Sequence, residues 1–385
     1  MNIEVSIAEL KVGHFVVDIA NQENSFSLTS SGHIKSQSII DMLESKGVQT
    51  VFIDPNKTVV QAAGASPKSR DSIARGIKKA HTVFEQSKAI QKKVFSDALN
   101  GVAIDLQPIV DITNQTIETV FDAPDAIACV VNIREKDAYL LEHSIAVSVY
   151  ISLFARHMAL PKHIIEQLAV GAFLHDVGKI MIPDKILNKP GRLTEEEFEV
   201  MKSHAAHSID IIKKTPDISP LSLEVAALHH EKINGDGYPN KVKGDDISLY
   251  GRMIAICDIF DALTANRVYK DGFTHHKAFV ILRELVKDNH LDNKLVEEFI
   301  RCIGAFPVGS LVKLHSNKLA IVEKPNSKDP TKPAVRSFYN VKHKHFVETK
   351  DIDLSKSQDF IEQAVRADDF DLDIKKITEL LLMAG

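Results

Sequence analysis

Residues 168–179 read Leu-Ala-Val-Gly-Ala-Phe-Leu-His-Asp-Val-Gly-Lys, an apolar run that ends in the pair His175-Asp176 and turns at Gly178-Lys179. The apolar residues follow helical spacing, so the stretch predicts a buried helix with two ionisable groups at its end. Burying an imidazole or a carboxylate costs several kcal/mol unless a partner compensates the lost hydration. The stretch therefore raises the question of what that partner is.

The same arrangement recurs in four further apolar helical segments. His143 opens one of them, His204 lies early in another, His229-His230 ends a third, and Asp258 lies inside a fourth. A single histidine or aspartate at the edge of a core is usually structural and hydrogen-bonded. Five histidines and two aspartates placed in this way on separate helices need a common partner, and divalent metal ions are the simplest one.

The ligand types narrow the chemistry of such a site. Imidazole and carboxylate without thiolate suit iron, manganese, nickel or zinc, and they argue against a structural cysteine-zinc site. Seven ligands exceed what one ion takes in a catalytic site, whereas two ions that share a carboxylate fit the count. Two metals ~3.5–4 Å apart are a recurring device for hydrolysing phosphate esters. The residues alone therefore predict a binuclear metallohydrolase.

Composition excludes several other classes of protein. The 385 residues are 44% hydrophobic and 26% charged, and 47 basic against 52 acidic side chains leave a net charge of -5, which argues against a DNA or RNA polymer as partner. Cys129, Cys257 and Cys302 form no close pair, so a disulfide framework is not expected. No secretion signal or apolar run of ~20 residues is present, so we expect no transmembrane segment and a cytoplasmic protein.

Sequence patterns along the chain predict a multidomain protein. We expect a small α/β N-terminal module at 1–62, a linker with connecting helices at 63–130, an all-α catalytic domain at 131–305, and a short β-rich unit with an acidic helical tail at 306–385. Residues 67–93 carry eight basic and two acidic side chains beside an apolar stripe that includes Ile77 and Phe84. We favour a solvated face on a helix that packs or forms a homodimer through the stripe, over a surface for a membrane or a phosphate-bearing partner.

Several motifs in the helical middle resemble the HD-GYP subfamily of the HD phosphohydrolases. The motifs are His175-Asp176 with Gly178-Lys179, His229-His230-Glu231, Gly237-Tyr238-Pro239, Asp258, Asp261-Ala262-Leu263-Thr264 and Arg267-Val268-Tyr269-Lys270. Their order and intervals agree over roughly residues 133–305. The resemblance implies an all-α HD fold that binds two or three metal ions and hydrolyses cyclic dinucleotides, chiefly cyclic di-GMP and in some members cyclic GMP-AMP. The stretch before residue 130 is similar to an accessory domain often found ahead of bacterial HD-GYP domains.

The resemblance also implies a role for each metal ligand. Asp176 would bridge the two ions, with His143, His175 and Asp258 in one coordination sphere and His204, His229 and His230 in the other. A hydroxide held between the metals would attack phosphorus and open the ring to the linear dinucleotide. Lys179 would neutralise the phosphate oxygens as charge builds in the transition state.

The remaining motif residues are expected around the substrate. Arg267 and Lys270 suit the second phosphate as a fork donor and a point charge. Tyr238 would shape the mouth of the pocket, either by stacking on a base or by packing. Glu231 would orient a metal-bound histidine from behind.

Two departures from the family pattern refine these expectations. Some relatives have an acidic ligand for a third metal one turn before the first histidine, where this chain has Tyr139, so we expect two ions, iron or manganese. The loop before Gly237 carries Asn234 and Asp236 where relatives often show an aspartate and a small residue, which leaves its contacts open. A catalytically silent cyclic-dinucleotide receptor and another HD-type nucleotide phosphohydrolase are the alternative functions, and a protein partner of the N-terminal module stays open.

Overall fold

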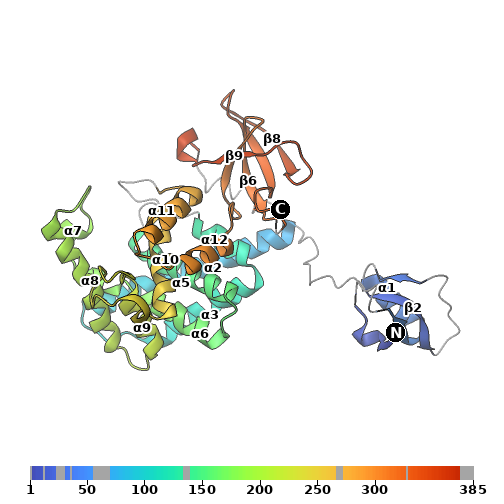
Figure 1. Ribbon diagram of the computed structural model, residues 1–385, viewed down its shortest axis with the longest axis horizontal. Helices are drawn as coiled ribbons and strands as arrows, with labels where there is room; N and C mark the ends of the chain where they lie inside the picture. The colour runs from blue at the N-terminus through green and yellow to red at the C-terminus, as the bar shows by residue number, and fades with distance from the viewer. Residues whose placement is uncertain are drawn as a thin grey trace. The chain divides into compact units, whose positions relative to one another are not determined.

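The computed structural model describes residues 2–11, 14–22, 31–34, 37–54, 70–132, 139–265, 272–326 and 328–372. These residues form two compact units, Met1–Lys68 and Ser69–Gly385 (Figure 1). The division into four segments expected from the sequence stays a prediction, and both the linker before residue 70 and the helical tail after residue 372 lie outside the described residues. None of the described helices is long and apolar enough to cross a bilayer.

The N-terminal unit is a small α/β module, as predicted. Its elements are β1 (Ile3–Ser6), the 3-10 helix η1 (Ile7–Glu9), β2 (Phe15–Gln22), β3 (Gly32–His33), α1 (Gln37–Ser45) and β4 (Val48–Ile53). The described strands form an antiparallel sheet in the order β1-β4-β2-β3. Val48, Val51 and Ile53 of β4 are buried with Ile40 and Leu43 of α1, so one face of the sheet and one face of the helix close a small core.

The second unit begins with the predicted helical body, which confirms an all-α domain. Its helices are α2 (Arg70–Leu99), α3 (Leu106–Asp122), α4 (Pro124–Asn132), α5 (Tyr139–His157), α6 (Lys162–Leu174), α7 (Asp184–Leu187), α8 (Glu195–Lys213), α9 (Pro220–Leu228), α10 (Leu249–Thr264), α11 (His275–Lys287) and α12 (Asn293–Ile303), with 3-10 turns η3 (Val177–Met181) and η4 (Gly244–Asp246). Helix α5 packs against α2, α3, α4, α6, α10 and α12, which makes it the central helix of the body.

Capping residues set where several of these helices begin. The Thr194 hydroxyl accepts a hydrogen bond from the Glu197 amide at 3.2 Å, and the Glu197 carboxylate accepts one from the Thr194 amide at 2.8 Å, which is a capping box at the start of α8. Ser219 caps α9 and Ser248 caps α10 in a similar way. Helices α8, α9 and α10 therefore each begin at a capping side chain that the local sequence supplies.

The chain closes with an antiparallel sheet, as the alternating pattern after residue 306 predicted. Its strands are β5 (Leu311–Leu314), β6 (Lys318–Lys324), β7 (Ala334–Asn340), β8 (His345–Asp353) and β9 (Ile361–Ala364), in the order β8-β7-β6-β5-β9, followed by the 3-10 turn η5 (Asp368–Phe370). Leu311, Leu319, Ile321 and Phe338 share one hydrophobic core with the helices. β8 was not anticipated because most of its side chains are exposed and show no apolar alternation.

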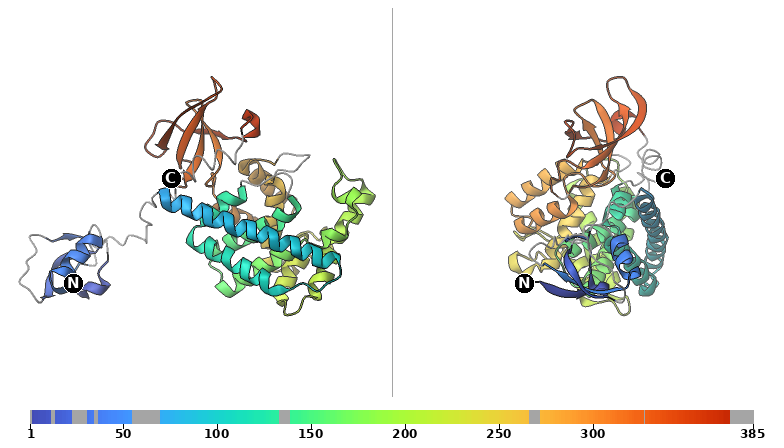
Figure 2. Two further views of the ribbon diagram at one scale, coloured as in Figure 1. Left: turned by 180° about the vertical axis from the view of Figure 1, so that it is seen from behind. Right: turned by 90° about the vertical axis from the view of Figure 1, so that its right-hand side faces the viewer.

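Helix α2 is part of this second unit. The left view of Figure 2 shows it as the long light-blue helix that runs along the helical body. Its apolar stripe packs against α3, α4 and α5, and Ile77 and Phe84 are 0% and 4% exposed. The expectation that the helix packs through this stripe is therefore confirmed, because the chain itself covers Ile77 and Phe84, and a homodimer stays a prediction. The basic side chains Arg75, Lys78 and Lys92 lie on the exposed face, as expected for a solvated surface.

A close approach between α6 and α9 gives a test of this packing. A Cβ atom at Gly171 would lie 2.6 Å from the Ser222 carbonyl oxygen and 2.9 Å from the Ser222 Cα, so Gly171→Ala must push the two helices apart. We expect it to lower the free energy of unfolding by about 1–3 kcal/mol, measured by thermal and urea denaturation.

The matched control is Gly76→Ala in α2. A Cβ there would meet only other side chains at 3.4–3.5 Å, which is ordinary contact. Alanine is the better helix former, so this variant should be unchanged or more stable by about 0.5–1 kcal/mol. Equal stability of the two variants would contradict the tight packing of α6 on α9.

Candidate metal centre

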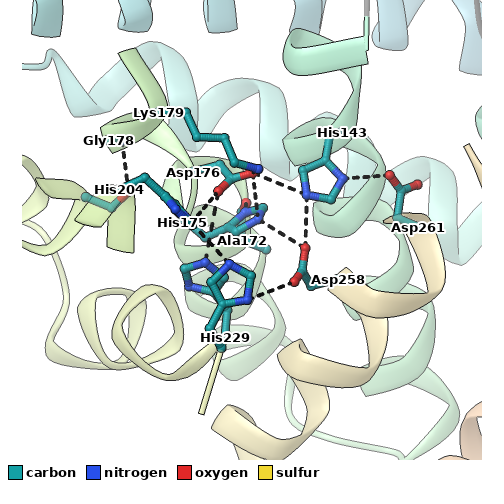
Figure 3. Close-up of polar contacts among 12 residues, drawn as sticks. His143, Ala172, His175, Asp176, Gly178, Lys179, His204, His229, Asp258 and Asp261 are labelled. Atoms are coloured by element: carbon teal, nitrogen blue, oxygen red, sulfur yellow. Dashed lines mark hydrogen bonds and ion pairs between the residues drawn. The ribbon is translucent and has the colours of Figure 1, made fainter. Parts of the chain in front are cut away.

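The seven predicted metal ligands come from separate elements and meet in one place. His143 lies on α5, His175 caps the C-terminus of α6, Asp176 directly precedes η3 as its N-cap, His204 lies on α8, His229 and His230 directly follow α9, and Asp258 lies on α10. Figure 3 shows the side chains pointing toward a common centre beside Asp176. His230 keeps 22% of its side chain exposed, whereas the side chains of the other six are at most 7% exposed.

The two carboxylate oxygens of Asp176 face different histidines. Oδ2 lies 3.3 Å from His143 Nε2 and 3.4 Å from His175 Nε2. Oδ1 lies 3.3 Å from His204 Nε2 and 4.0 Å from His229 Nε2. A carboxylate in this position can offer one oxygen to each of two neighbouring cations.

Potential ligand atoms gather in sets on both sides of Asp176. One set is His143, His175 and Asp258, and another is His204, His229 and His230, with ligand atoms within 4.8 Å of one another in each. A third, overlapping set joins Asp176 to His175 and His229. Two ligand atoms that each lie about 2.0–2.2 Å from the same ion are at most about twice that distance apart, which is comparable to the separations within each set. The described residues can therefore hold metal ions.

Local hydrogen bonds turn three of the imidazoles toward this centre. The Nδ1 atoms of His175, His204 and His229 donate to the carbonyl oxygens of the residues three positions earlier, at 2.6 Å each. A carbonyl oxygen can only accept, so Nδ1 carries the proton and the neutral ring presents the lone pair of Nε2 inward. This hydrogen bond from the other ring nitrogen is typical of histidine ligands.

Three buried atoms at the centre have no hydrogen-bond partner among the described residues. They are His175 Nε2, His229 Nε2 and Asp176 Oδ1, which also form one of the potential ligand sets. An unsatisfied buried polar group costs about 1–3 kcal/mol. Three such atoms directed at one point match the requirements of a cation, so these residues fit a metal centre on geometry as well as on donor type.

The charges of the site suit metal binding at neutral pH. Burial opposes the ionisation of Asp176, but the Lys179 ammonium and the surrounding histidines outweigh it and hold its pKa well below the usual value. Burial also opposes the ionisation of Asp258, whose pKa the neighbouring imidazoles of His143 and His175 lower. Burial lowers the pKa of His230 to about 3, against the opposing pull of Asp258. The carboxylates are therefore ionised and His230 is neutral.

Gly178 explains how α8 comes close enough to place His204. A Cβ atom at this position would lie 2.2 Å from the His204 carbonyl oxygen and 2.4 Å from the Ser208 amide nitrogen. The Gly178 amide instead donates a 2.8 Å hydrogen bond to the Ser208 hydroxyl. The glycine after the His-Asp pair thus lets the backbone of η3 touch α8, which holds His204 beside Asp176.

The Gly237-Tyr238-Pro239 loop covers the His230 side of the centre. A Cβ at Gly237 would lie 2.4 Å from the Lys232 amide nitrogen, so only glycine fits this approach. The Tyr238 ring packs on His230 with centroids 4.5 Å apart, so His230 covers one side of the ring, and stacking of the ring on a base stays a prediction. Asn234 and Asp236 hydrogen-bond to each other within the turn.

Glu231 does not orient a histidine, contrary to the expectation. Its two carboxylate oxygens accept hydrogen bonds from the amides of Asn240 and Val242 at 2.8 and 3.0 Å. The residue therefore holds the end of the Gly-Tyr-Pro loop against the turn that follows His230. Burial raises the pKa of Glu231, although these amides pull it down.

The expected substrate residues are described only in part. Lys179 reaches Asp176 Oδ2 with its ammonium group and keeps 16% of its side chain exposed, so it lies at the edge of the centre. Arg267 and Lys270 fall in residues 266–271, outside the described residues. Their place relative to the centre stays a prediction.

Asp261 is a functional residue for which the sequence predicted no role. Its Oδ2 lies 2.7 Å from His143 Nδ1, and the carboxylate is fully buried. It therefore holds His143 with Nε2 directed at Asp176 and Asp258, as backbone carbonyls do for the other histidines. The signal was available: Asp261 follows Asp258 by one helical turn in the same apolar helix, where a buried acid needs a partner.

This hydrogen bond leads to a testable outcome. Asp261→Asn removes the charge that supports His143, so we expect metal affinity to fall by about 10–100-fold while the helices stay folded. Metal titration by calorimetry, with circular dichroism to monitor the fold, measures both quantities. Asp210→Asn, an exposed acid on α8, is the control and should bind metal as the parent does. Equal affinity of both variants would show that Asp261 does not support His143.

Comparison with known proteins adds the family. Residues 130–295 match the family model described as HD domain, and residues 2–109 match a domain of unknown function, DUF3391. A cyclic di-GMP phosphodiesterase of Pseudomonas aeruginosa is 30% identical over 371 residues, covering 92% of this chain and 89% of the relative. A 3'3'-cGAMP-specific phosphodiesterase of Vibrio cholerae is 35% identical over 238 residues, covering 58% of this chain and 44% of the relative.

A solved structure supports the same fold. An HD-G"Y"P protein from Bdellovibrio bacteriovorus superposes with a TM-score of 0.50 over 79% of this chain and 99% of its own, at 14% sequence identity. The P. aeruginosa relative matches this chain over nearly its full length, including the part ahead of the HD domain. The chain therefore belongs to the HD-GYP group of HD-domain proteins, and it has a DUF3391 match ahead of the HD domain.

Proposed function

We propose that this chain is a metal-dependent phosphodiesterase that hydrolyses cyclic di-GMP or cyclic GMP-AMP to the linear dinucleotide. The observation that carries the proposal is the pair of potential ligand sets on either side of Asp176, whose two oxygens face different sets. The names of the two curated relatives support the substrate class, because one acts on cyclic di-GMP and the other on 3'3'-cGAMP.

The donor set supports two divalent ions, which we propose to be iron or manganese. His143, His175 and Asp258 would hold one ion and His204, His229 and His230 the other, with Asp176 shared between them. A bound pair of this kind supplies Lewis-acid charge to a phosphodiester and a nucleophile derived from water at neutral pH. Imidazole and carboxylate ligands without thiolate suit these metals.

The chain's own side chains would bind and orient the substrate. Lys179, which reaches Asp176 in the structure, can turn its ammonium toward a phosphate oxygen and stabilise the charge that develops there. Tyr238 packs over His230 and limits access from that side. We propose Arg267 and Lys270 for the second phosphate of the ring.

The three cysteines are free thiols, which supports a reducing, cytoplasmic setting.

A pair of histidines on α8 tests the proposal. His204→Ala removes a ligand next to Asp176, so turnover should fall by about 1000-fold or more and one of two bound ions should be lost. His207→Ala, three residues further along the same helix and outside the potential ligand sets, should keep both ions and most of the activity. Metal analysis and chromatography of the products from each cyclic dinucleotide measure these outcomes.

The same assay separates the alternatives. Metal-loaded parent protein that binds a cyclic dinucleotide tightly without linear product would indicate a receptor. Hydrolysis of nucleoside mono- or triphosphates in preference to cyclic dinucleotides would indicate another HD-type nucleotide phosphohydrolase. Either result would contradict the proposed reaction.

Arg267 provides a separate test of the substrate class. Arg267→Ala should raise KM about 10-fold or more through the loss of a charged hydrogen bond to the second phosphate, and the metal content should stay unchanged. Steady-state kinetics with metal analysis of the same samples checks this. A loss of metal with unchanged KM would show that Arg267 acts on the centre and not on the substrate.

A further inference from the structure

Helix α2 lies both within the N-terminal family match and within the second compact unit of the structure. The match to the domain of unknown function extends from residue 2 to residue 109 and so includes α2. The structure places the same helix in the second compact unit, where it packs against α3, α4, α5 and η3. Helix α5 carries His143, and η3 begins directly after Asp176. A helix from the domain of unknown function thus touches two elements of the metal centre.

One ion pair joins α2 to the start of α5. The Lys88 ammonium lies 3.3 Å from Glu142 Oε1, and Glu142 is 2% exposed and directly precedes His143. Lys88 also reaches the half-exposed Glu85 on its own helix at 2.7 Å. The Lys88 side chain is 19% exposed, and its ammonium group pairs with a buried carboxylate that directly precedes a proposed metal ligand.

The physical need for this lysine comes from Glu142. A buried carboxylate is destabilised unless its charge is compensated, and Lys88 supplies one cation within 3.3 Å of Glu142. Glu85 does not require Lys88 in the same way, since it keeps 46% of its side chain in solvent. The pair to Glu142 is thus one polar contact that ties the first turn of α5 to α2, in addition to the apolar packing of the two helices.

The position of α5 about its axis matters for His143. Neighbouring residues on a helix point in different directions, so Glu142 faces α2 while His143 faces the centre. A helix rotation of about 10° moves a side-chain tip about 5–6 Å from the axis by about 1 Å. Metal-ligand distances tolerate only about 0.2 Å. Fixing Glu142 on one side and His143 through Asp261 on the other therefore determines whether Nε2 meets the cation.

We infer that Lys88 is a positioning residue for the metal centre: through Glu142 it holds the first turn of α5, and so it sets the affinity of the ion held by His143, His175 and Asp258. The domain of unknown function then contributes a residue that positions one ligand of the metal centre. This inference rests on the proposed two-ion site. It concerns one of the two ions selectively, which a role in general stability would not produce.

The test compares three lysine variants in the full chain. Lys88→Met removes the charge and keeps the shape, so we expect about 10-fold weaker binding of one Mn²⁺ ion and unchanged binding of the other. Lys88→Arg keeps a cation and should restore both affinities. Lys93→Met is the control, because Lys93 pairs with Asp97 on the exposed face of the same helix. Each affinity is measured by titration with Mn²⁺, in which the concentration of the free ion is monitored by its electron paramagnetic resonance signal.

A double variant covers the case in which Lys88→Met destabilises the fold. Lys88→Met combined with Glu142→Gln removes both charges of the pair, so the cost of a buried carboxylate is avoided, and the weaker affinity for one ion should persist. Parent-like affinity for both ions in this folded double variant would overturn the inference, as would equal weakening of both ions in Lys88→Met. A parent protein that binds fewer than two ions would instead overturn the proposed function, so the two failures are distinguishable.

Discussion

The structure depends on the burial of one carboxylate among histidines. Asp176 has both oxygens in a site that solvent barely reaches, and its neighbours are imidazoles from α5, α6, α8 and α9. The Lys179 ammonium and these rings keep Asp176 ionised against the effect of burial. The same arrangement leaves Asp176 Oδ1 and two imidazole nitrogens without partners among the described residues. A site that is this polar and this dry therefore favours the entry of further positive charge.

Glycines allow this convergence, because several helices must approach one small volume. Gly178 brings η3 onto α8, Gly171 brings α6 onto α9, and Gly237 brings the loop onto the turn after His230. At each of these positions a Cβ atom would collide with backbone atoms. The histidines therefore reach the centre because the backbones beside them touch, and the ring directions then follow from short hydrogen bonds to backbone carbonyls or to Asp261.

The sequence was sufficient to predict the metal ligands, but it was not sufficient to predict the residues that hold those ligands in place. A histidine or aspartate at the edge of an apolar helix is conspicuous in one segment alone, so His143, His175 and Asp258 could be named and the structure brings them together. Lys88 and Glu142 are 54 positions apart in the sequence, and His143 and its partner Asp261 are 118 positions apart. No local pattern reports such a partner. Glu231 was misjudged for the same reason, because its partners are backbone amides that every residue possesses.

The place of α2 limits how this protein can be rearranged by recombination. A cut at residue 130, where the HD match begins, would leave a fragment that lacks α2 and α3. The apolar side chains that Ile77, Ile109 and Ile117 now cover would be open to water, and such a fragment would be prone to aggregate. The accessory domain therefore cannot be exchanged as a cassette at its family boundary, and any exchange that preserves the core must join the chain ahead of residue 70.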